Sequence, residues 1–130
     1  MTRLESNIVT VNKPAKEVFA FLSDFNNYKR LMPEQVTDWE STSDQCSFTI
    51  KGMGSLGMKM KDRIPDTSVV IEKNGKAPFD FLLTCSIQGK ENQSDVQLFF
   101  DAALNPMMKM MASRPLTNFL NLLAEKVKEI

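Results

Sequence analysis

Histidine is absent from this 130-residue sequence, so the side chain that most often acts as general base and metal ligand is not available. Cysteine is scarce as well. Cys46 and Cys85 are the two present, and their spacing is not that of a CxxC metal or redox motif. We therefore predict free, buried thiols, no metal site and no cofactor.

Net charge is also lacking, because 16 Lys and Arg balance 16 Asp and Glu. This balance does not favour nucleic acid or an anionic membrane as a partner. No stretch approaches the roughly 20 apolar residues of a membrane span. The N-terminus runs into the charged residues Arg3 and Glu5 with no apolar stretch of signal-peptide length. We expect a soluble cytoplasmic protein without integral membrane association, folded as one domain over residues 1–130.

The first part of the chain changes from an extended segment to short helices. Residues 4–11 are rich in β-formers, and the break at 12–14 leads into a stretch where Val18, Leu22 and Phe25 recur at helical spacing. Residues 28–32 are helical in type and are stopped by a proline. Two short helices are therefore predicted after the first strand.

From Gln35 onward the hydrophobic pattern has a period of two for about seventy residues, which is typical of strands with one wet face. The inward positions are Cys46, Phe48 and Ile50, then Leu56, Met58 and Met60, then Phe79, Phe81, Leu83, Cys85 and Ile87, and finally Val96, Leu98, Phe100, Ala102 and Leu104. Connections are predicted at 52–54, 65–66, 74–75 and 89–94 from their Gly, Pro, Asn and Asp content. The pattern predicts an antiparallel meander.

A long amphipathic helix is predicted from Asn105, a good N-cap, to Ile130, with Pro106 at its first position. After Pro115 its apolar stripe consists of Leu116, Phe119, Leu120, Leu123, Val127 and Ile130. Its first turns hold Met107, Met108, Met110 and Met111. Methionine suits either core packing or a surface that adapts to variable apolar shapes. A sheet with one apolar face needs a cover, and this helix is long enough to provide it.

Three short segments accompany this order of elements: Pro14 followed by Val18, Phe19, Leu22 and Asp24, then Leu31-Met32-Pro33, and then Asn105-Pro106. With the order of elements, they make the chain similar to the START-like superfamily (SRPBCC), which includes the birch-pollen allergen and bacterial polyketide cyclase-like proteins. The chain looks most like its small single-domain bacterial members. The resemblance implies an α+β helix-grip fold: a curved antiparallel sheet of about seven strands wrapped on the long C-terminal helix, with two short helices after the first strand.

The resemblance also implies a ligand site between the sheet and the long helix. Carried over by position, its wall comprises Tyr28, Met32, Trp39, Phe48, Met58, Met60, Phe79, Phe81, Leu83, Phe100, Met108, Met111 and Phe119. The sequence leaves open whether these side chains line an open cavity or fill it, because protein interiors normally pack densely.

Two charged residues have alternative positions. Strict alternation over residues 56–64 turns Asp62 inward, whereas a bulge or strand end exposes it. Projection from the later helical stripe places Lys109 on the sheet-facing side, whereas a change of phase at Pro115 lets it reach solvent. If both face inward, Asp62, Lys109 and the hydroxyl of Tyr28 form the polar end of an apolar pocket.

Binding or transport of a small hydrophobic molecule, such as a lipid or polyketide-like compound, is the function that these expectations favour. One alternative is a cyclase or hydratase-type enzyme, in which the pocket excludes water and a carboxylate, tyrosine or lysine moves a proton. Another is a protein-interaction module with a filled core. Such a module would use an exposed sheet face or edge to meet its partner. The outward residues Leu82 and Phe99 either support a homodimer or are scattered exposed apolar residues without a role.

Overall fold

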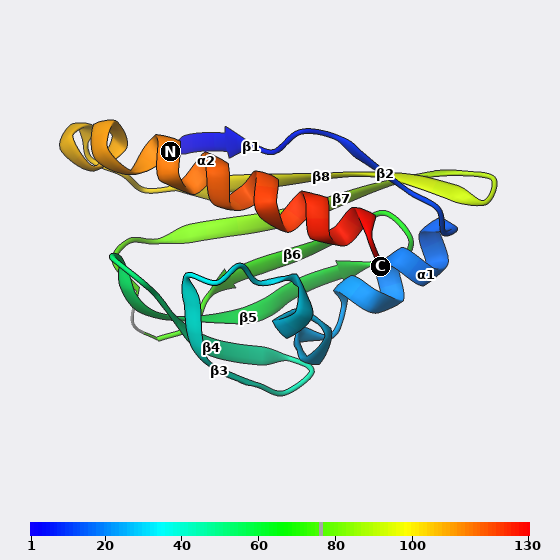
Figure 1. Ribbon diagram of the computed structural model, residues 1–130, viewed down its shortest axis with the longest axis horizontal. Helices are drawn as coiled ribbons and strands as arrows, with labels where there is room; N and C mark the ends of the chain where they lie inside the picture. Colours follow the sequence, from blue (N-terminus) through cyan, green and yellow to red (C-terminus); the bar gives the residue numbers. More distant parts are fainter. Residues whose placement is uncertain (76) are drawn as a thin grey trace.

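The computed structural model describes residues 1–75 and 77–130, and over these it has eight strands, two α-helices and two short 3₁₀ helices (Figure 1). The first elements are β1 (Thr2–Glu5), β2 (Val9–Val11), α1 (Ala15–Leu22), η1 (Phe25–Asn27) and η2 (Lys29–Leu31). The sheet continues with β3 (Val36–Ser41), β4 (Gln45–Ile50), β5 (Gly54–Ile64), β6 (Ser68–Lys73), β7 (Phe81–Lys90) and β8 (Gln93–Ala102). The last element is α2 (Pro106–Lys128).

The strands form one antiparallel sheet in the order β1-β8-β7-β6-β5-β4-β3, and β2 also pairs with β8. Figure 1 shows the sheet curving beside α2, whose C-terminal end lies close to α1. The predicted α+β fold, with a meander and a long covering helix, is confirmed. The sheet has eight strands where about seven were expected, because the opening extended segment is divided in two.

Ser6 is the residue that divides the opening segment. Between the pairs Glu5–Phe99 and Val9–Val96, residues 6–8 face only residues 97–98, so the first strand carries one extra residue. The N–H of Ser6 donates to the carbonyl of Leu98 at 2.9 Å, and the N–H of Leu98 donates to Ser6 Oγ at 2.9 Å. The hydroxyl thus replaces a missing strand acceptor, which satisfies a buried polar group.

Two strand boundaries differ from the prediction. β7 begins at Phe81, so Phe79 lies in the connection from β6, together with the predicted turn at Asn74 and Gly75. In contrast, β7 and β8 extend further into the predicted loop at 89–94, because Lys90 pairs with Gln93 across a two-residue turn. Residues 89–93 are exposed at the end of this hairpin, which accounts for their polar composition, whereas Ser94 is buried and its hydroxyl donates to the carbonyl of Lys13 at 2.8 Å.

Helix α2 begins where the sequence predicted, with Asn105 Oδ1 accepting a hydrogen bond from the N–H of Met108 at 2.8 Å. Its buried residues are Leu116, Leu120, Leu123, Ala124 and Val127. Four of them belong to the predicted stripe, whose other members Phe119 and Ile130 are half-buried, and the helix ends at Lys128 instead of Ile130. The first turns project past the end of the sheet (Figure 1), and there Met107, Met110 and Met111 are exposed. The methionine cluster therefore does not belong to the core.

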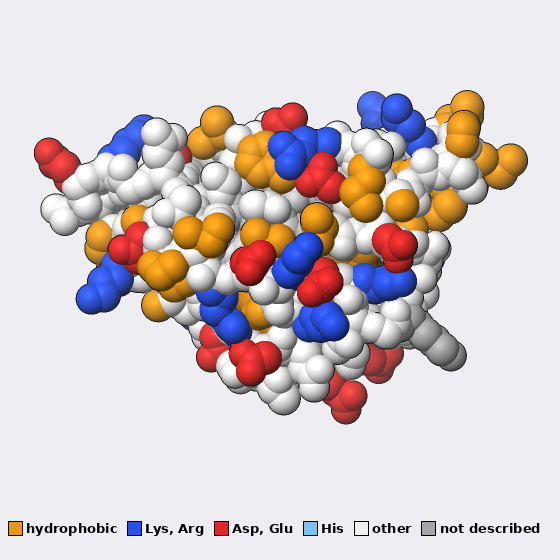
Figure 2. Space-filling view, turned by 180° about the vertical axis from the view of Figure 1, so that it is seen from behind, with side chains coloured by type: hydrophobic (Ala, Val, Ile, Leu, Met, Phe, Trp, Pro, Cys, Tyr) orange, Lys and Arg blue, Asp and Glu red, His pale blue; other side chains and the backbone are white. Residues whose placement is uncertain are grey.

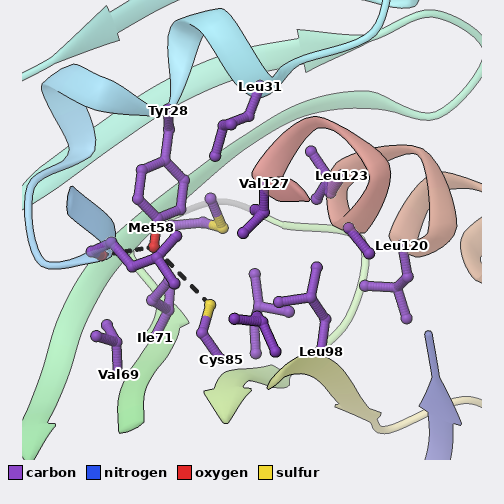
Figure 3. Close-up of a cluster of buried hydrophobic side chains, with 14 of the residues drawn as sticks. Tyr28, Leu31, Met58, Val69, Ile71, Cys85, Leu98, Leu120, Leu123 and Val127 are labelled. Carbon is purple, nitrogen blue, oxygen red and sulfur yellow. Dashed lines mark hydrogen bonds between the residues drawn. The ribbon is translucent and has the colours of Figure 1, made fainter. Parts of the chain in front are cut away.

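The core lies between the concave face of the sheet and the helices. In Figure 3, Leu120, Leu123 and Val127 of α2 point toward Ile71 of β6 and Leu98 of β8. Each such side chain contributes about 1.5–3 kcal/mol when it is fully buried. Cys46 and Cys85 are free and buried, as predicted, and their strands β4 and β7 are separated by β5 and β6.

The face seen in Figure 2 carries interspersed acidic and basic side chains with no large area of one sign. On the outer side of β8, the guanidinium of Arg3 lies 4.9 Å from the centre of the Phe99 ring and pairs with Asp101 at 2.8 Å. Phe99 and Leu82 are both half-buried. Arg3 therefore covers part of the apolar surface that suggested a homodimer.

Within the described residues, no helix combines the length and apolarity of a membrane span.

Candidate functional site

An apolar cavity with a volume of about 60 Å³ lies between the sheet and the C-terminal helix. All sixteen residues that line it are hydrophobic: Tyr28, Met32, Phe48, Ile50, Met53, Leu56, Met58, Pro78, Phe79, Phe81, Leu83, Phe100, Leu116, Phe119, Leu120 and Leu123. Its single hydroxyl belongs to Tyr28. The cavity is thus built to accept apolar surface.

Two periodicities place this lining. In the strands, alternate residues face the helix, which brings Phe48 of β4, Met58 of β5 and Leu83 of β7 to the same side. In α2, residues separated by three or four positions share a face, which adds Leu116 and Leu120 from the opposite side. The cavity therefore follows directly from the pattern of inward residues.

Three phenylalanines form one side of the cavity. The ring centres of Phe81 and Phe100 are 5.1 Å apart in a stacked arrangement, and Phe79 meets them edge-on at 6.3 Å and 6.1 Å. Contacts of this kind stabilise an aromatic cluster by about 0.5–1.5 kcal/mol per pair beyond burial. This side of the cavity is therefore held together by aromatic contacts as well as by burial.

Tyr28 lines the cavity, and Figure 3 shows its ring beside Met58 with the hydroxyl pointing toward Cys85. Its hydroxyl donates to the carbonyl oxygen of Leu22 at 2.7 Å and lies 3.9 Å from Cys85 Sγ. Because the single hydroxyl proton is given to Leu22, the thiol is the donor in the contact with Cys85. Burial raises the pKa of Tyr28 well above its ordinary value, and the neighbouring Cys85 adds to the effect. The Tyr28 hydroxyl is therefore neutral, and its proton is already used in the hydrogen bond to the Leu22 carbonyl.

The thiols of Cys46 and Cys85 are unreactive. Burial raises the pKa of Cys46 to about 12, and burial also raises the pKa of Cys85 to about 12. A thiol is nucleophilic only as the thiolate. Both cysteines are therefore protonated at neutral pH and act as small apolar groups.

Asp62 and Lys109 lie outside the cavity. The pairing of β5 with β6 shifts between Met60 and Asp62, and this bulge leaves the Asp62 side chain exposed. Lys109 is exposed on the part of α2 that precedes Pro115 and lines a surface recess at the chain's N-terminal end. The inward alternative is wrong for both residues. The polar constellation with Tyr28 is not assembled.

Four further residues predicted for the wall lie elsewhere. The ring of Trp39 is half-buried and stacks on Phe48 at 5.2 Å, with its indole N–H donating to Ser41 Oγ at 3.1 Å. Met60 and Met108 are half-buried without lining the cavity, and Met111 is exposed. The nine predicted residues that do line the cavity are Tyr28, Met32, Phe48, Met58, Phe79, Phe81, Leu83, Phe100 and Phe119.

Seven lining residues were not in the predicted wall: Ile50, Met53, Leu56, Pro78, Leu116, Leu120 and Leu123. Five of these stand on the inward phase of a strand or on the helical stripe, so a stricter use of the two periodicities finds them. Met53 and Pro78 lie in connections between strands, where no periodic signal exists.

A surface groove of about 400 Å³ adjoins the cavity. Its lining consists of Gln35, Ile50, Lys51, Gly52, Met53, Met111, Ala112, Pro115, Leu116 and Phe119. Ile50, Met53, Leu116 and Phe119 line both the cavity and the groove. These four side chains, which we call the partition, separate the interior space from the surface.

Within residues 1–75 and 77–130, no three acidic or cysteine side chains gather in a group suited to a metal ion.

Comparison with known proteins finds no matching family model and no matching curated protein. Solved structures do match. A START superfamily protein from Mycobacterium smegmatis superposes with a TM-score of 0.70 over 98% of this chain and 97% of that chain, at 15% sequence identity. The chain has the START-like fold.

Two other proteins with the START-like fold carry functional names. A point mutant of norcoclaurine synthase from Thalictrum flavum, in complex with a transition state analogue, matches with a TM-score of 0.75 at 11% identity, over 98% of this chain and 92% of that chain. The di-domain ARO/CYC protein BexL, from the BE-7585A biosynthetic pathway, matches with a TM-score of 0.68 at 14% identity, over 98% of this chain and 47% of that chain. At these identities the likeness is one of fold.

Proposed function

We propose that this protein binds a small hydrophobic molecule in the cavity between the sheet and α2. The observation that carries the proposal is the lining, which is hydrophobic at all sixteen positions. Apolar surface that leaves water for such a space gains about 25 cal/mol per Å². A ligand that buries about 200 Å² of apolar surface therefore gains about 5 kcal/mol before the entropic cost of association.

The cavity must expand to hold more than a fragment. Its volume of about 60 Å³ has room for about four water-sized groups, whereas pockets for drug-sized ligands are about 300 Å³ or larger. Met32, Met53 and Met58 supply the means, because methionine has three rotatable bonds and refills irregular spaces at low cost. Lipid or polyketide-like ligands are therefore expected to bind with these methionines in new rotamers.

Binding is favoured over catalysis by the chemistry of the lining. A proton-transfer step needs a group within hydrogen-bond reach of the substrate, and the cavity lining contains no carboxylate, ammonium or imidazole group. Tyr28 is committed to Leu22, and Asp62 and Lys109 lie at the surface. The enzyme names of norcoclaurine synthase and BexL support the alternative of a cyclase-type enzyme through the shared fold alone.

Native mass spectrometry of the protein purified from a lipid-rich host tests the proposal, followed by organic extraction of any passenger. A neutral naphthalene dye, N-phenyl-1-naphthylamine, provides a second measurement by fluorescence titration. We expect a co-purifying hydrophobic molecule or saturable one-to-one dye binding. A clean apo mass together with no dye binding would instead support an interaction module with a filled core.

A pair of variants on one strand shows whether the cavity itself is occupied. Leu83 lines the cavity, and its neighbour Leu82 points to the other face of β7. Leu83→Phe places additional volume in the cavity and is expected to weaken dye binding at least about fivefold, because overlap with the ligand forfeits close contacts. Leu82→Phe makes the same chemical change on the outer face and is expected to leave the affinity unchanged.

A further inference from the structure

The partition between the cavity and the groove consists of two buried and two half-buried side chains. Ile50 and Leu116 are 9% and 7% exposed, and Met53 and Phe119 are half-buried. All four line both spaces, and Met53 and Phe119, as the less buried pair, are the side chains whose displacement would join the interior cavity to the surface groove. One elongated apolar site then runs from Tyr28 to the surface.

The backbone is irregular on both sides of the partition. Gly52 and Gly54 flank Met53 with φ angles of +89° and +101°, and no atom lies within 4 Å of the position that a Cβ would take at either glycine. On the helix side, Pro115 has no N–H, so the carbonyl of Met111 lacks its usual donor four residues later. The N–H of Met53 donates to the carbonyl of Ile50 at 2.9 Å, so movement at the partition is a change of side-chain rotamer at Met53 and Phe119 that leaves this hydrogen bond in place.

The lining of the groove carries a positive charge and no negative charge. Lys51 is the charged residue of its lining, which contains no carboxylate. Among the described residues, Arg3, Arg63, Lys73 and Lys90 form ion pairs, and Lys51 forms none. The N–H of Lys51 donates to the carbonyl of Gln35 at 2.9 Å, which fixes the base of the side chain at the edge of the groove. An ammonium group is thus available beside an apolar surface.

We infer that the ligand is a single-chain amphiphile with an anionic head group, held with its apolar chain in the cavity and its head beside Lys51. This inference rests on the proposed function. The apolar lining accommodates the chain, and the displaced Met53 and Phe119 surround its middle. The ammonium of Lys51 pairs with a carboxylate or a phosphate, which share the negative charge that this position recognises.

Competition against N-phenyl-1-naphthylamine tests the inference with four C12 compounds: dodecanoate, dodecyl phosphate, dodecanol and dodecylammonium. Lys51→Gln is expected to weaken dodecanoate or dodecyl phosphate about two- to fivefold at low salt, the range of an exposed ion pair, and to leave dodecanol unchanged. Lys51→Glu is expected to weaken the anions up to about tenfold and to strengthen dodecylammonium. Added salt is expected to shrink these differences. The relative response of the two anions distinguishes a carboxylate from a phosphate head.

Lys59→Gln is the matched control, because Lys59 is exposed on β5 and lies outside the groove. An equal loss of anion affinity in Lys59→Gln, or an unchanged anion affinity in Lys51→Gln, overturns the inference while dye binding leaves the proposed function standing. If the dye binds to none of the proteins and none of the four compounds binds directly by calorimetry, the proposed function fails and the inference fails with it.

Discussion

The hydroxyl of Tyr28 donates to the carbonyl oxygen of Leu22 at 2.7 Å. Leu22 is the last residue of α1, and carbonyls at a helix C-terminus have no donor within the helix. The same tyrosine ring lines the cavity. The Tyr28 hydroxyl therefore caps the C-terminus of α1, and the ring of the same side chain forms part of the apolar cavity wall.

Tyr28→Phe separates these two roles. Loss of the buried hydrogen bond is expected to lower the free energy of unfolding by about 1–2 kcal/mol, because the Leu22 carbonyl is left without a partner. The apolar wall is retained, so the affinity for N-phenyl-1-naphthylamine is expected to stay within about twofold, the usual limit of a small wall change. Urea unfolding followed by fluorescence of Trp39, the single tryptophan, gives the stability. Loss of dye binding in a folded variant would show that the hydroxyl contacts the ligand.

The buried thiols make stability fall at alkaline pH. Each folded-state pKa is about 12, whereas an unfolded thiol titrates near about 8.5. The stabilising effect is therefore fully present below about pH 8.5 and is lost as the pH rises toward 12, by roughly 1.4 kcal/mol per thiol for each pH unit. Replacing both cysteines by alanine is expected to reduce the slope of stability against pH between about 9 and 12. An unchanged slope would mean that other groups cause the loss.

Arg63 joins β5 to two distant loops. Its guanidinium donates to the carbonyl of Ser23 at 2.9 and 3.0 Å, to the carbonyl of Ser43 at 3.3 Å and to Asp44 at 2.8 Å. Arg63→Ala is expected to lower the free energy of unfolding by about 1–3 kcal/mol, since three of these contacts serve backbone carbonyls. Asp44→Ala removes only the exposed ion pair and is expected to cost less than about 1 kcal/mol. Equal effects in urea unfolding would contradict the importance of the carbonyl contacts.

Enlargement of the cavity is expected to improve binding while it weakens the fold. Leu120 lines the cavity and is 3% exposed, so Leu120→Ala should lower the free energy of unfolding by about 3 kcal/mol. The additional space should increase the affinity for N-phenyl-1-naphthylamine, because fewer side chains need to move. Leu122→Ala on the outer face, where Leu122 is 44% exposed, is the control and should change stability by less than about 0.5 kcal/mol. A weaker affinity in folded Leu120→Ala would contradict the location of the site.

The fold was predictable because burial dictates the pattern of the sequence. Inward residues such as Leu83 and Leu98 alternate along their strands, which predicts one apolar face of the sheet. Leu120 and Leu123 recur at helical spacing along α2, which predicts the apolar helix face that packs against it. Irregular backbone limited the prediction. The extra residue at Ser6 divided one strand into two, which no period of two reveals.

The site was predictable to the extent that it uses regular elements. The shift between Met60 and Asp62 reverses the alternation, so Asp62 is exposed although its position in the sequence matches the inward phase. A shift between Thr37 and Glu40 similarly changes the register around Trp39. The resemblance to the START-like superfamily placed Met111 in the wall, but the helix runs past the sheet there and Met111 is exposed. These differences arise from local geometry that a single sequence does not encode in its periodicity.

The methionines provide the most direct test of ligand binding, by NMR of ¹³C-methyl-labelled methionine during titration with N-phenyl-1-naphthylamine. Met32, Met53 and Met58 line the cavity, whereas Met1, Met107 and Met110 are exposed away from it. We expect saturable shifts of the three cavity methyl signals at one dye per chain, with little change in the exposed ones. Shifts confined to the exposed methionines, or no saturation, would contradict binding in the cavity between the sheet and α2.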